Sequence, residues 1–177
     1  LGTTAINTGS ASFLTLATAA ATTINMTNAH AVSLGDLTGA GYAKVATLNA
    51  SGATGAVDAA IGSTSLQGLA FTGGAGNDVL AGSTGADTIS GGLGNDSLTG
   101  AAGIDSLVGG GGTDTMAGGT GADVMTGGTG VDTYQFTANT ALLSQSTSAA
   151  SDRITNFTSG SDKLDTGAVA FLGNFAN

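Results

Sequence analysis

The sequence predicts an all-β protein whose central part is a right-handed parallel β-roll, a flattened solenoid of short strands. Three observations lead to this fold class. Residues 73–135 divide into seven consecutive segments of nine residues without an insertion. In every segment Gly occupies the first and fourth positions and Asp the sixth, and a large apolar or aromatic residue occupies the eighth. Self-similarity at a fixed period is the signature of a solenoid, in which each repeat packs only against its neighbours.

The nine-residue spacing has a direct physical interpretation. Six Gly-rich residues make a tight turn, because Gly adopts backbone angles that other residues avoid. Three residues then form a short strand whose middle side chain points inward, so that the eighth positions build a thin core: Leu80, Ile89, Leu98, Leu107, Met116, Met125 and Tyr134. Two segments complete one coil, and equivalent turns stack at roughly 4.8 Å, the spacing between strands. The right hand follows the usual hand of parallel crossovers.

This stacking places the sixth-position Asp residues in two columns, one along each edge of the roll. The first column holds Asp78, Asp96, Asp114 and Asp132, and the second holds Asp87, Asp105 and Asp123. Carboxylates about 5 Å apart repel by roughly 1 kcal/mol in water and by about 3 kcal/mol at an effective dielectric near 20. A hard divalent cation between successive turns removes this conflict, and calcium takes about six to eight carboxylate and carbonyl oxygens.

We therefore predict about five or more calcium ions, between the pairs 78/96, 96/114, 114/132, 87/105 and 105/123. Each site should combine Asp carboxylates with loop carbonyls from both turns. The turn residues expected to contribute are Gly74, Gly76, Gly92, Gly94, Gly110, Gly112, Gly119, Gly121, Gly128 and Gly130.

The pattern resembles the RTX calcium-binding repeats, whose nine-residue consensus G-G-x-G-x-D-x-U-x forms a parallel β-roll. The resemblance covers residues 73–135. A flexible Gly-rich linker is the alternative, but linkers do not hold Asp and an apolar residue in register. Ser83 and Ala101 replace the second Gly of their segments, which predicts looser turns at these two points.

Residues 1–72 form a Thr- and Ala-rich segment in which short runs alternate between apolar and polar residues. This period of two predicts strands within 12–17, 22–28, 31–34 and 44–49, either as irregular β-solenoid coils or as a small β-domain before the roll. Residues 52–62 are expected to form a loop or one helical turn. Phe71 lies nine residues before Leu80 and extends the apolar column, whereas Leu69 lies nine before Asp78 and cannot bind metal.

Residues 136–177 leave the repeat and are predicted to cap the roll. Ala141 lies nine residues after Asp132, so the Asp columns are expected to end there. The segment 151–165 resembles the one that follows the roll in RTX exoproteins of the serralysin type, with Asn156 in place of the usual second Asp. Its apolar residues would cover the open strand edges. Asp152 either closes a last calcium site or is a surface turn residue.

The composition excludes several classes of function. Only Lys44, Arg153 and Lys163 are basic against twelve Asp, a net charge of −9, so a nucleic-acid-binding surface is not expected. No apolar run predicts a transmembrane helix. The single His30 has no obvious partner and the chain has no Glu, no Cys and no G-x-S-x-G motif, so no catalytic activity is expected. A charged fraction of 8 % fits an extended β structure in an extracellular assembly.

The resemblance implies three alternatives for function. The first is a bacterial S-layer subunit exported by type I secretion, in which calcium orders the roll and supports self-association into a surface lattice. The second is the C-terminal roll of a secreted protease or lipase whose catalytic domain lies upstream of Leu1. The third is an adhesin stalk. Residues 1–72 favour the first, because they resemble further solenoid; the absence of an initial Met predicts a fragment or a processed chain. No particular anchor, such as a surface polysaccharide, is predicted.

Overall fold

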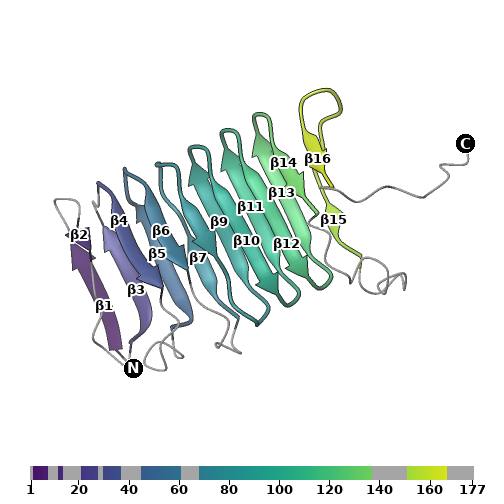
Figure 1. The fold of residues 1–177 in the computed structure, drawn as a ribbon. Helices are drawn as coiled ribbons and strands as arrows, with labels where there is room; N and C mark the ends of the chain where they lie inside the picture. The colour runs from purple at the N-terminus through teal and green to yellow at the C-terminus, as the bar shows by residue number, and fades with distance from the viewer. Residues whose placement is uncertain are drawn as a thin grey trace, which may run out of the picture.

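Two parallel sheets that face each other make up the protein, as the computed structural model shows (Figure 1). The structure describes residues 2–7, 12–13, 21–27, 30–36, 45–60, 68–136 and 151–166, with side chains described at 23–26, 30–34, 45–60, 68–136 and 151–166. Every element within these ranges is a strand and none is a helix. The predicted all-β class and parallel roll are therefore confirmed.

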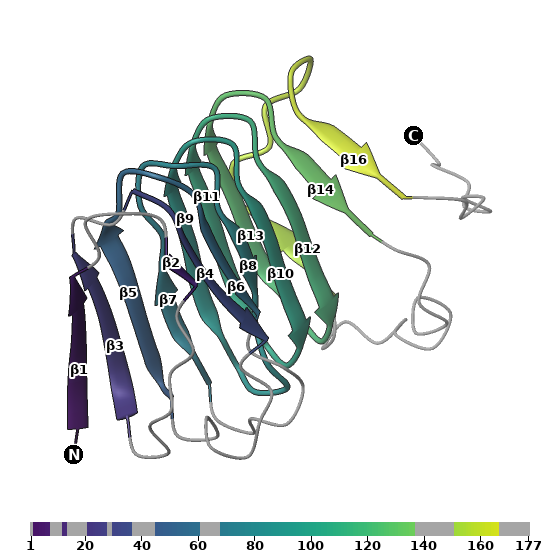
Figure 2. The ribbon, with the colours of Figure 1, turned by 60° about the vertical axis from the view of Figure 1, so that its left-hand side comes forward.

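The strands alternate between the two sheets along the chain (Figure 2). The odd sheet contains β1 (Gly2–Asn7), β3 (Ala21–Thr27), β5 (Thr47–Gly52), β7 (Ala70–Thr72), β9 (Thr88–Leu93), β11 (Ser106–Gly111), β13 (Val124–Thr129) and β15 (Arg153–Ile154). The even sheet contains β2 (Ser12–Phe13), β4 (Val32–Asp36), β6 (Val57–Ala60), β8 (Val79–Ala81), β10 (Ser97–Ala102), β12 (Thr115–Thr120), β14 (Thr133–Gln135) and β16 (Lys163–Asp165). Two consecutive strands thus complete one coil.

The register within the roll follows the predicted eighteen-residue coil. Leu98 pairs with Met116 in the even sheet, and Leu107 pairs with Met125 in the odd sheet. The coil length is set by two turns of six residues and two short strands, so each side chain lies over its equivalent in the next coil. Phe71 pairs with Ile89, as expected from its place in the apolar column.

The core is a single file of apolar side chains between the sheets. All seven eighth-position residues are at most 1 % exposed, as predicted: Leu80, Ile89, Leu98, Leu107, Met116, Met125 and Tyr134. The same file continues towards the N-terminus through Phe71, Ala59, Leu48 and Ile24. Burying each such side chain contributes roughly 1.5–3 kcal/mol, so the core stabilises the whole length of the solenoid rather than one centre.

The segment before the roll is further solenoid, in agreement with the first of the two predictions made for it. Strands β3, β4 and β5 overlap the predicted runs 22–28, 31–34 and 44–49 with shifted bounds. β2 covers only the start of 12–17, whose remainder is outside the described residues. The prediction for 52–62 was wrong, because β6 lies within it. Val57 and Ala59 are buried and Asp58 is exposed, which is a strand alternation hidden by small side chains.

The segment after the roll adds one more strand to each sheet. β15 pairs with β13 and β16 pairs with β14, both parallel. Ile154 packs against the core, and the ring of Phe157 lies 6.0 Å from that of Tyr134. Leu164, however, is 55 % exposed. The predicted cap is therefore correct for Ile154 and wrong for Leu164, which continues the sheet without covering it. Phe157 contacts Tyr134 but is 42 % exposed, so it covers the end only in part.

Candidate metal centre

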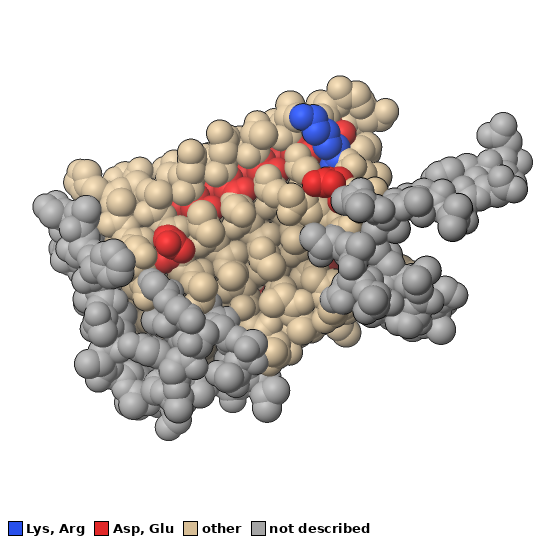
Figure 3. Space-filling view, in the orientation of Figure 1, with Lys and Arg blue, Asp and Glu red and all other residues tan. Residues whose placement is uncertain are grey.

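The seven sixth-position Asp side chains lie in the two predicted columns and point into the turns. They are at most 3 % exposed. In each column the Oδ1 atom accepts a hydrogen bond from the backbone N–H of the Asp one coil earlier. The donor–acceptor distances are 2.8 Å from Asp78 to Asp96 and 2.8 Å from Asp87 to Asp105, and the later pairs repeat the pattern. Figure 3 shows acidic side chains in a line along one edge of the roll.

Both columns extend beyond the seven repeats. At the N-terminal end, Val57 N–H donates to Asp78 Oδ1 and Leu69 N–H donates to Asp87 Oδ1, each at 2.7 Å. Leu69 thus occupies a column position without a carboxylate, as predicted. The columns consequently begin on a coil that offers backbone donors and has no carboxylate at the column positions.

The prediction that the columns end at Asp132 was wrong. Asp123 N–H donates to Asp152 Oδ1 at 3.0 Å, and Asp132 N–H donates to Asp162 Oδ1 at 3.1 Å. Asp152 is therefore a column member rather than an isolated turn residue. Counting by nine missed Asp162 because more residues separate β14 from β15 than separate earlier strands. Its G-x-D spacing from Gly160, the same as in the repeats, was the available signal.

The second carboxylate oxygen divides the turns into two kinds. In five turns the Asp Oδ2 atom is buried and has no hydrogen-bond partner: Asp96, Asp105, Asp114, Asp123 and Asp132. We call 91–96, 100–105, 109–114, 118–123 and 127–132 the open turns. In the other two, a backbone N–H of the same turn donates to Oδ2, from Gly74 to Asp78 at 2.9 Å and from Ser83 to Asp87 at 2.5 Å. We call 73–78 and 82–87 the closed turns.

The backbone follows the same division. Each open turn has a positive φ at its second and fourth residues, whereas no residue of the closed turns does. The positive-φ residues of the open turns are Gly92, Gly94, Ala101, Gly103, Gly110, Gly112, Gly119, Gly121, Gly128 and Gly130. Of the glycines predicted as ligands, eight therefore lie in open turns, and Gly74 and Gly76 lie in a closed one.

The two departures from the repeat behave differently. Ala101 keeps the path of the open turns with a φ of 82°, the one positive value at a non-Gly residue in the described parts of the chain. The loosening predicted at Ala101 is therefore not observed. Ser83 does change its turn, but it tightens it, because its hydroxyl and its N–H both donate to Asp87.

The electrostatics of the open turns favour a bound cation. Burial, and then the charges of Asp78 and Asp114, raise the pKa of Asp96 to about 7. Burial, and then the charges of Asp123 and Asp87, raise the pKa of Asp105 to about 6. A buried carboxylate oxygen without a partner costs about 1–3 kcal/mol or more. A proton or a cation relieves that cost.

The donor set fits a hard cation with oxygen ligands. Within the described residues, no three His, Cys, Asp or Glu side chains come together, so a metal here must also take backbone carbonyls. Carboxylate and carbonyl oxygens supplied by a flexible loop are what calcium prefers, whereas zinc takes nitrogen and sulfur.

The comparison with known families agrees with this geometry. Residues 72–107 and 108–135 match the family model of the RTX calcium-binding nonapeptide repeat, in four copies. Residues 72–135 are RTX calcium-binding repeats. The match covers the roll and leaves the segments on either side unassigned. No curated protein matches the chain.

The C-terminal end of the RTX roll is closed by side chains. Gly127 N–H donates to Tyr134 Oη and to Asn156 Oδ1, each at 2.9 Å, and Tyr134 Oη donates to Asn156 Oδ1 at 3.1 Å. Asn156 Nδ2 donates to the Gly128 carbonyl at 3.1 Å. Earlier in the roll, Gly73 N–H donates instead to a strand carbonyl of the next coil. Asn156 therefore satisfies backbone groups at the end of the last coil. Its amide donates a hydrogen bond that an Asp carboxylate could not donate.

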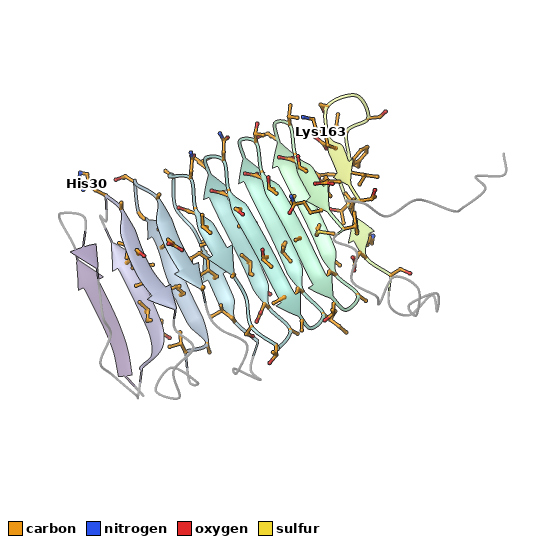
Figure 4. The ribbon with its side chains drawn as sticks, in the orientation of Figure 1. His30 and Lys163 are labelled. Carbon is orange, nitrogen blue, oxygen red and sulfur yellow. The ribbon has the colours of Figure 1, made fainter. Side chains whose placement is uncertain are left out.

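The single histidine of the chain lies outside the RTX repeats. His30 is exposed and lies towards the N-terminal end, far from Lys163 at the other end (Figure 4). No helix in the described ranges is long and apolar enough to cross a membrane. The absence of enzymatic activity stays a prediction.

Proposed function

We propose that this chain is part of a calcium-dependent structural protein of a bacterial cell surface, namely an S-layer subunit. Its RTX roll would bind calcium after type I secretion, fold, and support assembly into a lattice. One observation carries the proposal. The two sheets of the roll run on through β7, β6 and β5 to β1 and β2 as one rod (Figure 2). A roll embedded in a longer solenoid is expected of a structural element.

The distribution of charge supports self-association. The Asp columns are buried, and calcium would neutralise them. The face seen in Figure 3 carries few other charges. Neighbouring rods would therefore meet through neutral Thr, Ser and Ala side chains without strong repulsion.

The dependence on calcium indicates that the roll would fold outside the cell. A site filled at ten times its dissociation constant contributes about 1.4 kcal/mol, so five such sites contribute roughly 7 kcal/mol, comparable to the stability of a whole domain. Cytosolic calcium would leave most sites empty and the roll easy to thread through a channel. Extracellular calcium would fill them and drive folding outside the cell.

The alternative is the C-terminal roll of a secreted protease or lipase. The observation in its favour is the segment 151–165, which resembles the one that follows the roll in serralysin-type exoproteins. An adhesin stalk would also use a long solenoid. If either alternative is correct, purified chains would not form two-dimensional arrays.

The test is electron microscopy of the purified chain with millimolar calcium, with excess chelator, and with magnesium in place of calcium. An S-layer subunit should form two-dimensional arrays in calcium alone. Separate, calcium-folded rods at high protein concentration would contradict the S-layer assignment while leaving calcium binding intact. Sequencing upstream of Leu1 provides a second test, because a zinc-protease or Ser-hydrolase motif there would favour the exoenzyme.

A further inference from the structure

The two closed turns differ from the five open turns in what surrounds the Asp carboxylate. We propose that calcium binding begins only at turn 91–96, that turns 73–78 and 82–87 fold without metal, and that Ser83 is the residue that closes turn 82–87. This proposal rests on calcium binding by the open turns.

Three protein donors hold the carboxylate of Asp87, with at least one donor on each oxygen. Its Oδ1 accepts from Leu69 N–H at 2.7 Å and from Ser83 Oγ–H at 3.0 Å, and its Oδ2 accepts from Ser83 N–H at 2.5 Å. Gly85 N–H donates to Ser83 Oγ at 3.1 Å, which directs the hydroxyl proton towards Asp87. Ser83 is 0 % exposed. A cation needs the carboxylate lone pairs that these three donors already use. The hydrogen atoms of the donors also bear partial positive charge, which would repel a cation at this carboxylate.

Turn 100–105 is a natural comparison, because it follows turn 82–87 along the same column. Ala101 occupies the position of Ser83, and Asp105 Oδ2 has no partner. Ala101 has a Cβ and still takes a φ of 82°. A Cβ therefore does not prevent the open conformation. The side-chain difference between the two turns is the hydroxyl of Ser83, which donates to Asp87 Oδ1 while the Ser83 N–H donates to Oδ2, and we infer that this second donor holds the carboxylate in the closed position.

Turn 73–78 is closed for a second reason, its contact with the preceding coil. Ala75 N–H donates to the Ala53 carbonyl at 3.0 Å, and Val57 N–H donates to Asp78 Oδ1 at 2.7 Å. A Cβ on Gly74 would lie 2.3 Å from the Ala53 carbonyl oxygen. The turn thus takes its path from a coil that is not an RTX repeat.

Together the closed turns join the solenoid to the calcium-binding coils. They offer the strand edges of a coil that is already folded. The next coil can pair with these edges without the free-energy cost of forming a first coil. We therefore expect the chain to fold in two parts, with residues 45–60 and 68–87 ordered without calcium and residues 91–132 ordered by it.

The test is calcium stoichiometry of the full chain by native mass spectrometry and equilibrium dialysis. Ser83→Gly should bind one more ion than wild type, because Asp87 loses the hydrogen bond from the Ser83 hydroxyl and the turn can open. Ala101→Ser should bind one fewer, because it places the hydroxyl against Asp105. Ala101→Gly is the matched control and should bind the same number as wild type.

An unchanged number of ions in both Ser83→Gly and Ala101→Ser would overturn the role of Ser83. Wild-type protein that binds no calcium would instead contradict the calcium-binding function itself, so the two failures are distinguishable. Hydrogen exchange of wild type in chelator needs no variant to fold. Slow exchange of the Leu69, Gly74 and Ser83 amides, with fast exchange across 91–132, is expected; equally fast exchange in both regions would refute the two-part folding.

Discussion

The backbone N–H of Asp105 donates to Oδ1 of Asp123 at 2.9 Å, while Asp105 Oδ1 accepts from the N–H of Asp87 at 2.8 Å. Each central Asp thus holds together the coils before and after it and also offers Oδ2 to a cation. Structural and metal-binding roles fall on the same side chain, so the columns and the calcium sites should form and fail together.

Asp105→Ala should raise the calcium concentration at the folding midpoint more than Asp78→Ala. Asp105 is open, so its loss removes a ligand of the 105/123 site, worth about 1.4 kcal/mol for a site at ten times its dissociation constant, and also the acceptor for the Asp87 N–H. Asp78 is terminal, and its Oδ2 is already satisfied by Gly74. Circular dichroism against free calcium measures both midpoints. Equal midpoints, or a roll fully folded in excess chelator, would mean that calcium does not organise the fold.

Metal-free protein should become more stable as the pH falls from about 7.5 to about 5. The pKa of Asp96 is raised to about 7 and that of Asp105 to about 6, from 3.8, first by burial and then by neighbouring carboxylates. The folded roll therefore binds protons more tightly than the unfolded chain. The stabilisation is complete below the unfolded pKa and is lost as the pH rises through the folded values.

Circular dichroism of calcium-free protein at several pH values checks this expectation, because the part of the roll that is unfolded without calcium at neutral pH should gain β-structure on acidification. The exposed Asp58 lies outside the columns, so Asp58→Asn is the matched control and should keep the dependence. Asp96→Asn should weaken it. A metal-free β-structure content that falls on acidification would show that burial of the carboxylates is not the dominant cost.

Tyr134→Phe should destabilise the calcium-loaded roll by about 1–2 kcal/mol, because it removes one of two acceptors for Gly127 N–H and the donor to Asn156 Oδ1. Asn156→Asp should also destabilise it, since it loses the donor to the Gly128 carbonyl. Chemical denaturation in saturating calcium gives both values. Gln135→Ala, on the neighbouring outward-facing position, is the control and should change little; an equal loss there would indicate a nonspecific effect.

Ala101→Gly should stabilise the roll by about 0.5–1 kcal/mol. Ala101 has a φ of 82°, which costs an L-residue with a Cβ roughly 1–2 kcal/mol. Gly removes this strain but raises the conformational entropy of the unfolded chain, which offsets part of the stabilisation. The melting temperature in saturating calcium measures the effect. Gly103→Ala, at a φ of 140° in the same turn, should move it in the opposite direction. A stabilising Gly103→Ala would argue against strain as the cause.

The amino-acid sequence by itself determined the coil length, the two sheets, the buried file from Leu80 to Tyr134 and the two Asp columns. Each of these depends on a local rule repeated every nine residues, so that register along the chain becomes register in space. Small side chains concealed β6, because Val57 and Ala59 give only a weak alternation.

The tertiary structure alone decided which carboxylates are open. The sixth position is Asp in all seven repeats, yet Asp87 is closed and Asp105 is open. That difference depends on one hydroxyl and on the coil stacked underneath, neither of which belongs to the nine-residue pattern. The structure also decided that Asp152 and Asp162 continue the columns, because pairing of β15 and β16 restores in space a register that the chain has lost in sequence.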